Sequence, residues 1–187
     1  MGTPEFSVPC LDILNKSKHQ VVGVVTATDK PAGRGKKIKS SAVKKYSIDN
    51  ELFLMQPEKL KADTFIDQLK ELKADIFIVV AFRMLPKMVW DLPSLGTVNL
   101  HASLLPNYRG AAPINWAIIN GEKISGITTF FINEEIDKGA ILLQEEISIE
   151  SSFSAGDLHD IMMNRGAKLI LETVNKLATS SLKKIDQ

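Results

Sequence analysis

The strongest chemical signal in the sequence is an asparagine and a histidine that are one residue apart. In a strand, Asn99 and His101 would project from the same face, about 7 Å apart along the chain direction. An amide and an imidazole that face one ligand can both donate hydrogen bonds to an oxygen that gains negative charge. Acyl transfer requires such donors, because its carbonyl becomes tetrahedral. The alternative interpretation is that both side chains only bond the turn at a strand end.

An acidic segment supplies a third candidate group. Asp137 lies within NEEIDKG at residues 133–139, which follows an apolar stretch. A carboxylate beside an imidazole favours the charged ring and holds its orientation. Taken alone, an aspartate shortly before Gly139 is also typical of an ordinary turn. The acyl-transfer interpretation therefore depends on a fold that brings Asp137 to the same sheet edge as the histidine.

Other common catalytic motifs are absent from the sequence. The GRG at residues 33–35 lacks the third glycine of a GxGxxG phosphate-binding motif, and no GxxxxGK[ST] occurs. The three histidines and Cys10 show no paired metal-ligand spacing, so we expect no metal. His19 and His159 are expected on helix surfaces. Cys10 lies among apolar residues and is expected to be a buried small hydrophobe.

Composition favours an ordinary globular chain. The 187 residues include 44% hydrophobic and 24% charged residues, with 23 Lys and Arg against 22 Asp and Glu. This length fits one domain. The longest apolar run, residues 76–82, is far shorter than the ~20 residues of a membrane span. No signal peptide is recognisable at the start and there is a single cysteine, so we expect a cytoplasmic protein. We also expect a monomer.

Hydrophobic periodicity predicts alternating helices and strands. Helices are expected over residues 6–18, 42–50, 63–73, 112–119 and from 154 onward, and strands over 21–25, 52–54, 76–81, 97–101, 127–132 and 140–147. This alternation predicts a Rossmann-like α/β fold, with a mostly parallel sheet flanked by helices. Asn99 and His101 would then lie at a carboxyl strand end, where such sheets bind ligands.

Three local features refine this fold. Ser154 and Asp157 have the spacing of a capping box at the start of the last helix. Gly166 is expected to bend or break that helix. Helical sequence begins at Phe6 with only MGTPE before it, so we expect the first strand of such a fold to be truncated.

The sequence resembles the folate-dependent formyltransferases. The NLH at residues 99–101, the run SLLPNYRGAAPINW at 103–116 and the EIDKG at 135–139 match that family's signature in order and spacing. The resemblance covers essentially the whole chain, residues 1–187, as the catalytic domain. It implies formyl transfer from 10-formyltetrahydrofolate to an amine without a metal. It also implies that Asn99, His101 and Asp137 are the catalytic residues.

The resemblance further implies two segments that contact the folate donor. The segment after the catalytic histidine would line the 10-formyltetrahydrofolate site, and an earlier one would border the pterin pocket. These residues are Ser103, Leu104, Leu105 and Pro106, and Phe82, Arg83, Met84 and Leu85. The earlier segment reads AFRMLP here, where many relatives have AYG followed by a slightly longer stretch.

The formyl acceptor depends on a basic segment outside this core. Family members act on glycinamide ribonucleotide, on nucleotide-linked amino sugars or on methionyl-tRNA, and all share the core. Residues 29–45 carry seven Lys and Arg against one Asp, and Arg34, Lys36 and Lys37 lie in a stretch that resembles the loop that tRNA-dependent members place at the tRNA acceptor end. Lys and Arg neutralise nucleic-acid phosphates, although a charge run is more often only a solvated surface.

This segment implies methionyl-tRNA as the acceptor. A small amine acceptor, and an RNA-binding or folate-binding fragment without turnover, stay open as alternatives. Members that act on methionyl-tRNA also carry a smaller β-barrel tRNA-binding domain after a linker, and we expect that domain to be absent from residues 1–187.

Overall fold

A mixed four-stranded sheet forms the centre of the protein. The computed structural model describes residues 1–32 and 37–187. The strands are β5 (Phe77–Val80), β6 (Thr97–His101), β7 (Ile124–Phe131) and β8 (Ile141–Ser148), in that order across the sheet. β5 and β6 are parallel, whereas β6–β7 and β7–β8 are antiparallel. The predicted α/β class is confirmed, and the antiparallel pairing of β7 with β8 follows from the short connection between these two strands.

Residues Met1 and Gly2 connect this sheet to a second parallel pair, β1 (Val24–Val25) and β4 (Leu54–Met55). Gly2 forms a parallel bridge with Val80, and its N–H donates to the Val25 carbonyl at 3.0 Å. A Cβ at Gly2 would lie 2.8 Å from the Val80 carbonyl oxygen. Only glycine allows the backbones to approach this closely. The predicted strand over residues 21–25 is thus confirmed only in its last two residues.

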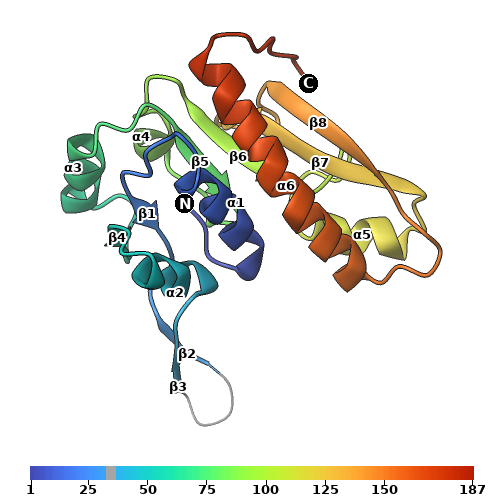
Figure 1. Cartoon of the computed structure of the whole chain (residues 1–187), viewed down its shortest axis with the longest axis horizontal. Helices are drawn as coiled ribbons and strands as arrows, with labels where there is room; N and C mark the ends of the chain where they lie inside the picture. Colours follow the sequence, from blue (N-terminus) through green and yellow to red (C-terminus); the bar gives the residue numbers. More distant parts are fainter. Residues whose placement is uncertain (33–36) are drawn as a thin grey trace.

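Helices cover the sheet on both sides (Figure 1). The long α6 lies across β7 and β8 with α1 beside it, and the β2–β3 hairpin projects from the body. The remaining elements are η1 (Glu5–Ser7), α1 (Val8–Asn15), β2 (Lys30–Ala32), β3 (Lys37–Lys39), α2 (Ala42–Asp49), α3 (Asp63–Glu71), α4 (Lys87–Trp90), α5 (Pro113–Ile119) and α6 (Ala155–Ala178).

The last helix, α6, differs from its prediction at one position. Its capping box is confirmed, because the Ser154 hydroxyl accepts from the Asp157 N–H and the Asp157 carboxylate accepts from the Ser154 N–H. The helix nevertheless runs unbroken through Gly166, so the expected bend or break is wrong. A Cβ there would lie 2.6 Å from a methyl group of Leu100 on β6. Gly166 therefore lets the helix pack closely on the sheet beside the predicted site.

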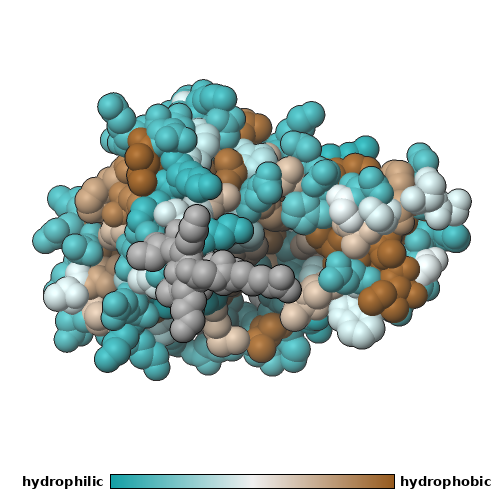
Figure 2. All heavy atoms as spheres, turned by 90° about the horizontal axis from the view of Figure 1, so that it is seen from below, coloured by the Kyte–Doolittle hydropathy of each residue, from teal (hydrophilic) through white to brown (hydrophobic). Residues whose placement is uncertain are grey.

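The hydrophobic core lies mainly between the sheet and the helices α1 and α6. Cys10 belongs to this core at 2% exposure, as predicted, and burial raises the pKa of its thiol to about 12. A hydrophilic surface surrounds the core, and Figure 2 shows hydrophobic side chains gathered at the end of the molecule that carries α5. Trp116 and Ile119 of that helix are exposed. No helix in the described ranges has the length and apolar character needed to cross a membrane.

Candidate active site

A cavity of about 840 Å³ opens at the carboxyl ends of β5 and β6. Its volume lies in the range of pockets that enclose small-molecule ligands. Its wall is formed mainly by the chain after β5, the end of β6, the start of α5 and the loop after β7. These segments are residues 81–85, 99–102, 110–115 and 132–137, joined by Pro4, Phe6, Val79, Lys87, Trp90, Phe130 and His159.

The structure brings the three predicted catalytic side chains together in this cavity. Asn99 and His101 lie on one face of β6, as the alternation of a strand predicts. Asp137 reaches the same place from the loop after β7, and its Oδ2 lies 3.7 Å from Nδ1 of His101. Both side chains are largely buried, at 8% exposure for the histidine and 17% for the aspartate. Because little water surrounds the two side chains, electrostatic interactions between them are only weakly screened.

Both ring nitrogens of His101 face hydrogen-bond acceptors. Nε2 lies 2.8 Å from the carbonyl oxygen of Tyr108. Because a carbonyl only accepts, Nε2 must carry the proton of that hydrogen bond. Nδ1 faces the Asp137 carboxylate, so a second proton on the ring would meet a negative charge. The imidazole of His101 is therefore held between a backbone carbonyl and a carboxylate.

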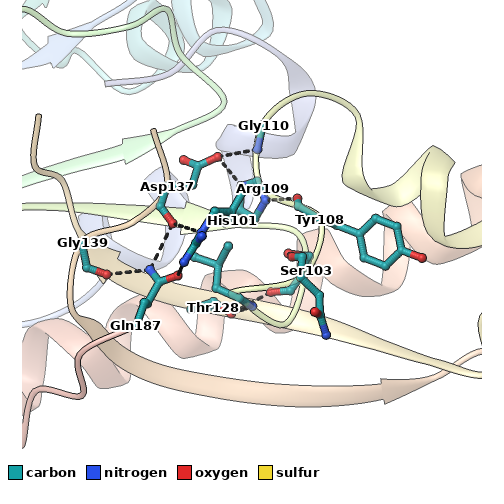
Figure 3. A network of polar contacts seen from close by, with 11 residues as sticks. His101, Ser103, Tyr108, Arg109, Gly110, Thr128, Asp137, Gly139 and Gln187 are labelled. Atoms are coloured by element: carbon teal, nitrogen blue, oxygen red, sulfur yellow. Dashed lines mark hydrogen bonds and ion pairs between the residues drawn. The ribbon is translucent and has the colours of Figure 1, made fainter. Parts of the chain in front are cut away.

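The loop that carries Asp137 is held in a left-handed conformation. The backbone φ of Asp137 is +53°, a conformation that aspartate tolerates better than most non-glycine residues. The backbone N–H of Gly110 donates to Asp137 Oδ2 at 2.8 Å, and Arg109 Nε donates to the Asp137 carbonyl at 3.1 Å. Figure 3 shows these contacts converging on the aspartate from the chain that follows His101. The position of the carboxylate is thus fixed from two sides.

The predicted pterin-bordering segment, residues 82–85, lines the cavity. The Arg83 guanidinium donates hydrogen bonds to the carbonyl oxygens of Pro57 and Glu58, and it lies 5.6 Å from the centre of the Phe82 ring. These contacts turn the arginine toward the chain after β4 and fix the segment against it.

A salt bridge joins two walls of the cavity. Lys87 Nζ on α4 lies 2.6 Å from Glu134 Oε1 in the loop after β7. The hydrogen bond and the opposite charge lower the pKa of Glu134 and raise that of Lys87. Both side chains are mostly exposed, so the pair contributes little to stability.

The second predicted folate segment, Ser103, Leu104, Leu105 and Pro106, does not reach the cavity wall. The Ser103 hydroxyl donates to the Asn107 carbonyl at 2.6 Å, and Leu105 donates its N–H to Thr128 Oγ1 at 3.1 Å. Ser103 and Leu105 are buried. The chain after β6 therefore turns into the protein behind His101. The folate contact that the resemblance implies for this segment stays a prediction.

Sequence reasoning missed the residues that hold this turn. Thr128 lies opposite His101 across β6 and β7, and its hydroxyl donates to the Ser103 carbonyl at 2.6 Å. Gln144 on β8 donates to Thr128 Oγ1 at 2.9 Å and to the Leu105 carbonyl at 2.8 Å. Little in the sequence points to them, because both strands carry further polar residues, such as Thr129 on β7 and Glu145 on β8.

The two remaining histidines differ in position. His19 Nε2 lies 2.9 Å from Asn175 Oδ1, and His159 Nδ1 lies 2.9 Å from Asp160 Oδ1. His159 also lines the cavity, with its ring edge-on to Phe6 at 5.2 Å between centroids. Its side chain is 37% exposed on α6, in agreement with its prediction on a helix surface, whereas His19 lies beyond the end of α1, so its prediction on a helix is wrong. Among the described residues, no group of histidine, cysteine and carboxylate side chains could hold a metal ion.

Most of the predicted tRNA-contacting residues lie outside the residues that the structure describes. Arg34 and Lys36 are outside the described residues, and Lys37 is described only through its backbone, as the first residue of β3. At the base of the same segment, Lys44 Nζ lies 2.6 Å from Asp29 Oδ2, which lowers the pKa of that carboxyl. One of the seven positive charges is thus neutralised within the protein.

A family model described as formyl transferase matches residues 1–174 of the chain. The chain therefore belongs to the formyl transferase family. Proteins named methionyl-tRNA formyltransferase are similar to it: that of Flavobacterium johnsoniae is 59% identical over 182 residues, and that of Bacteroides fragilis is 54% identical over 187 residues. The matches cover 97% and 100% of this formyl transferase chain. In both cases they span 58% of the relative.

Solved structures of other formyl transferases share this fold. A phosphoribosylglycinamide formyltransferase from Bacillus halodurans aligns with a TM-score of 0.78 and 21% identity, over 95% of this chain and 93% of that one. A sugar 3N-formyl transferase, solved with dTDP and 5-N-formyl-THF, aligns with a TM-score of 0.73 and 22% identity, over 100% of this chain and 64% of that one. At this identity the likeness concerns the fold alone.

Proposed function

We propose that this chain transfers a formyl group from 10-formyltetrahydrofolate to the α-amino group of methionyl-tRNA. The observation that carries the proposal is the convergence of Asn99, His101 and Asp137 in one cavity of a formyl transferase fold. The choice of acceptor is supported by relatives that are named for it and are 54% to 62% identical over nearly the whole chain. The chain spans a little over half of those relatives.

The chemistry begins with attack of the uncharged amine on the formyl carbon. A carbon–nitrogen bond forms and the carbonyl oxygen becomes an oxyanion. The Asn99 amide and a protonated His101 donate to this oxygen, and the Asp137 carboxylate balances the charge on the ring. Collapse of the intermediate then breaks the bond between the formyl carbon and N10 of the folate.

One proton must move during the reaction. The attacking nitrogen loses a proton and N10 of the departing folate gains one, so the transfer is balanced without any other reactant. We infer that a water molecule beside Asp137 relays this proton, because the carboxylate lies at the cavity and accepts hydrogen bonds there.

The cavity also suits the folate donor. Phe82, Leu85, Trp90 and Ile132 give part of its wall an apolar and aromatic character. Flat heteroaromatic rings bind in pockets of this kind, with a few polar groups that fix their orientation. Asn99 and His101 would supply those groups next to the formyl carbon.

A side-by-side assay of three acceptors tests the proposal. The chain is incubated with 10-formyltetrahydrofolate and with methionyl-tRNA, glycinamide ribonucleotide or a UDP-linked amino sugar. We expect formylation of methionyl-tRNA, and His101→Ala serves as the matched control for background reaction. Formylation of only a small amine would replace the proposed acceptor. Formylation of none would favour a binding fragment without turnover.

A further inference from the structure

Gln187 occupies an unexpected position in the polar network around the candidate site. Its side-chain oxygen accepts from Arg109 Nη2 at 2.8 Å and from Arg109 Nε at 3.3 Å. Its side-chain nitrogen donates to the Asp137 carbonyl at 3.0 Å and to the Gly139 carbonyl at 2.6 Å. These four contacts use the amide's two N–H groups and both lone pairs of its oxygen. Figure 3 shows Gln187 beneath the Asp137 loop, between Gly139 and Arg109.

The chain that carries Gln187 is anchored independently of this side chain. After α6 it returns to the sheet, where Ile185 forms an antiparallel bridge with Ile141 at the start of β8. Two backbone hydrogen bonds of 2.7 and 2.9 Å make this bridge. Gln187 follows two residues later and is therefore delivered to the loop between β7 and β8 by main-chain pairing.

The Asp137 loop needs such support. A non-glycine residue with positive φ persists only where its surroundings hold it. Gly110 fixes the carboxylate, but the carbonyls of Asp137 and Gly139 are both bonded by Gln187, with Arg109 as a shared partner. Without Gln187, the Gly139 carbonyl would lose this partner and the Asp137 carbonyl would keep only Arg109, so the loop would move more freely and the bond between Gly110 and the carboxylate would open more often.

We propose that Gln187 is a positioning residue, which holds the backbone of the Asp137 loop so that the carboxylate stays beside His101. It acts through Asp137 and does not itself line the cavity. Only the kinetic part of this inference rests on the proposed function. The structural part concerns the loop alone and is measured without substrate.

The first test reads the hydrogen bond between Gly110 and Asp137 by NMR. In Gln187→Ala we expect the Gly110 amide proton to shift and to exchange with solvent roughly tenfold faster, as a hydrogen-bonded support is removed. Lys183→Ala is the matched control, because Lys183 is exposed on the same segment and has no side-chain partner among the described hydrogen bonds and ion pairs. An unchanged Gly110 amide in Gln187→Ala would overturn the proposal.

The second test separates the two halves of the Gln187 amide. Gln187→Glu keeps an acceptor for Arg109 but offers no N–H to the two carbonyls, so we expect it to resemble Gln187→Ala. Both should lower kcat about tenfold with KM for the folate donor unchanged. Wild-type kcat in Gln187→Glu would show that the carbonyl hydrogen bonds do not matter. If neither the wild type nor any variant shows turnover, but Gln187→Ala still changes the exchange of the Gly110 amide proton, then the proposed function fails and the positioning role of Gln187 stands.

Discussion

His101 Nδ1 and Asp137 Oδ2 lie 3.7 Å apart, although one belongs to the end of β6 and the other to the loop beyond β7. Since the proposed reaction needs the two side chains together, we expect the losses of His101→Ala and Asp137→Asn to be far from additive. Each should lower kcat about 10²–10³-fold, and the double variant should be no slower than the worse single one. Steady-state kinetics of the three variants measures this. Fully additive losses would mean that the two residues act separately.

Asn99 gives a second kinetic prediction. Its side chain lies beside His101 on the cavity face of β6 and is only half buried. Asn99→Ala removes one donor to the oxyanion, so kcat should fall about 10²–10³-fold. Urea unfolding checks that the fold is retained, and its midpoint is expected to stay close to that of the wild type. Wild-type turnover by this variant would contradict the assigned role.

Much of the fold was predictable, because hydrophobic periodicity and capping motifs in the sequence mark several helices and strands, β6 among them. The strand over residues 97–101 and the capping box at Ser154 match their predictions. The wrong prediction at Gly166 has a physical cause. Glycine has a low helix propensity, but at this position the close packing of α6 against Leu100 requires a residue without a side chain. Local preference carries no information about which distant side chain needs the space.

The candidate site was predictable in part, for a similar reason. Asn99 and His101 share a face through strand alternation, which the sequence contains. The contribution of Gln187 depends on a return of the chain to β8, and no local pattern encodes this. The buried hydrogen bonds of Ser103 likewise depend on Thr128 from another strand. Contacts between distant segments are therefore what the sequence alone could not supply.

Gly139 provides a prediction about stability. A Cβ at this position would lie 1.7 Å from the Phe131 carbonyl oxygen, and a backbone atom cannot move aside cheaply. Gly139→Ala should lower the free energy of unfolding by about 1–3 kcal/mol or more, and should also lower kcat because Asp137 is in the same loop. Urea unfolding measures the first effect. The control is Gly156→Ala, where a Cβ meets only Ser154 Oγ at an ordinary 3.5 Å, and an unchanged stability of Gly139→Ala would contradict the observed packing.

The capping box predicts a specific pH dependence. Hydrogen bonds from the Ser154 hydroxyl and backbone N–H lower the pKa of Asp157 below its usual value of 3.8. A carboxyl whose pKa is lowered by folding stabilises the protein above its unfolded pKa, and this contribution is lost as the pH falls through the folded pKa. The stability difference between wild type and Asp157→Asn should therefore be constant near neutrality and shrink below about pH 4. Urea midpoints across this range test it, and a difference that grows on acidification would be inconsistent with the hydrogen bonds.

The basic segment offers the sharpest test of the proposed acceptor. Replacing Arg34, Lys36 and Lys37 with alanine removes three positive charges from the segment that contains β2 and β3. KM for methionyl-tRNA should rise, and the dependence of log KM on log salt should become shallower by about 0.7–0.9 for each phosphate that is no longer neutralised. The affinity for 10-formyltetrahydrofolate should stay unchanged, because the proposed donor site is the cavity, and none of the described residues of this segment lines it. Lys16→Ala, which removes an exposed lysine at the end of α1, controls for net charge alone. If the triple variant keeps the wild-type salt dependence, the segment is only a solvated surface and tRNA binding must depend on other residues.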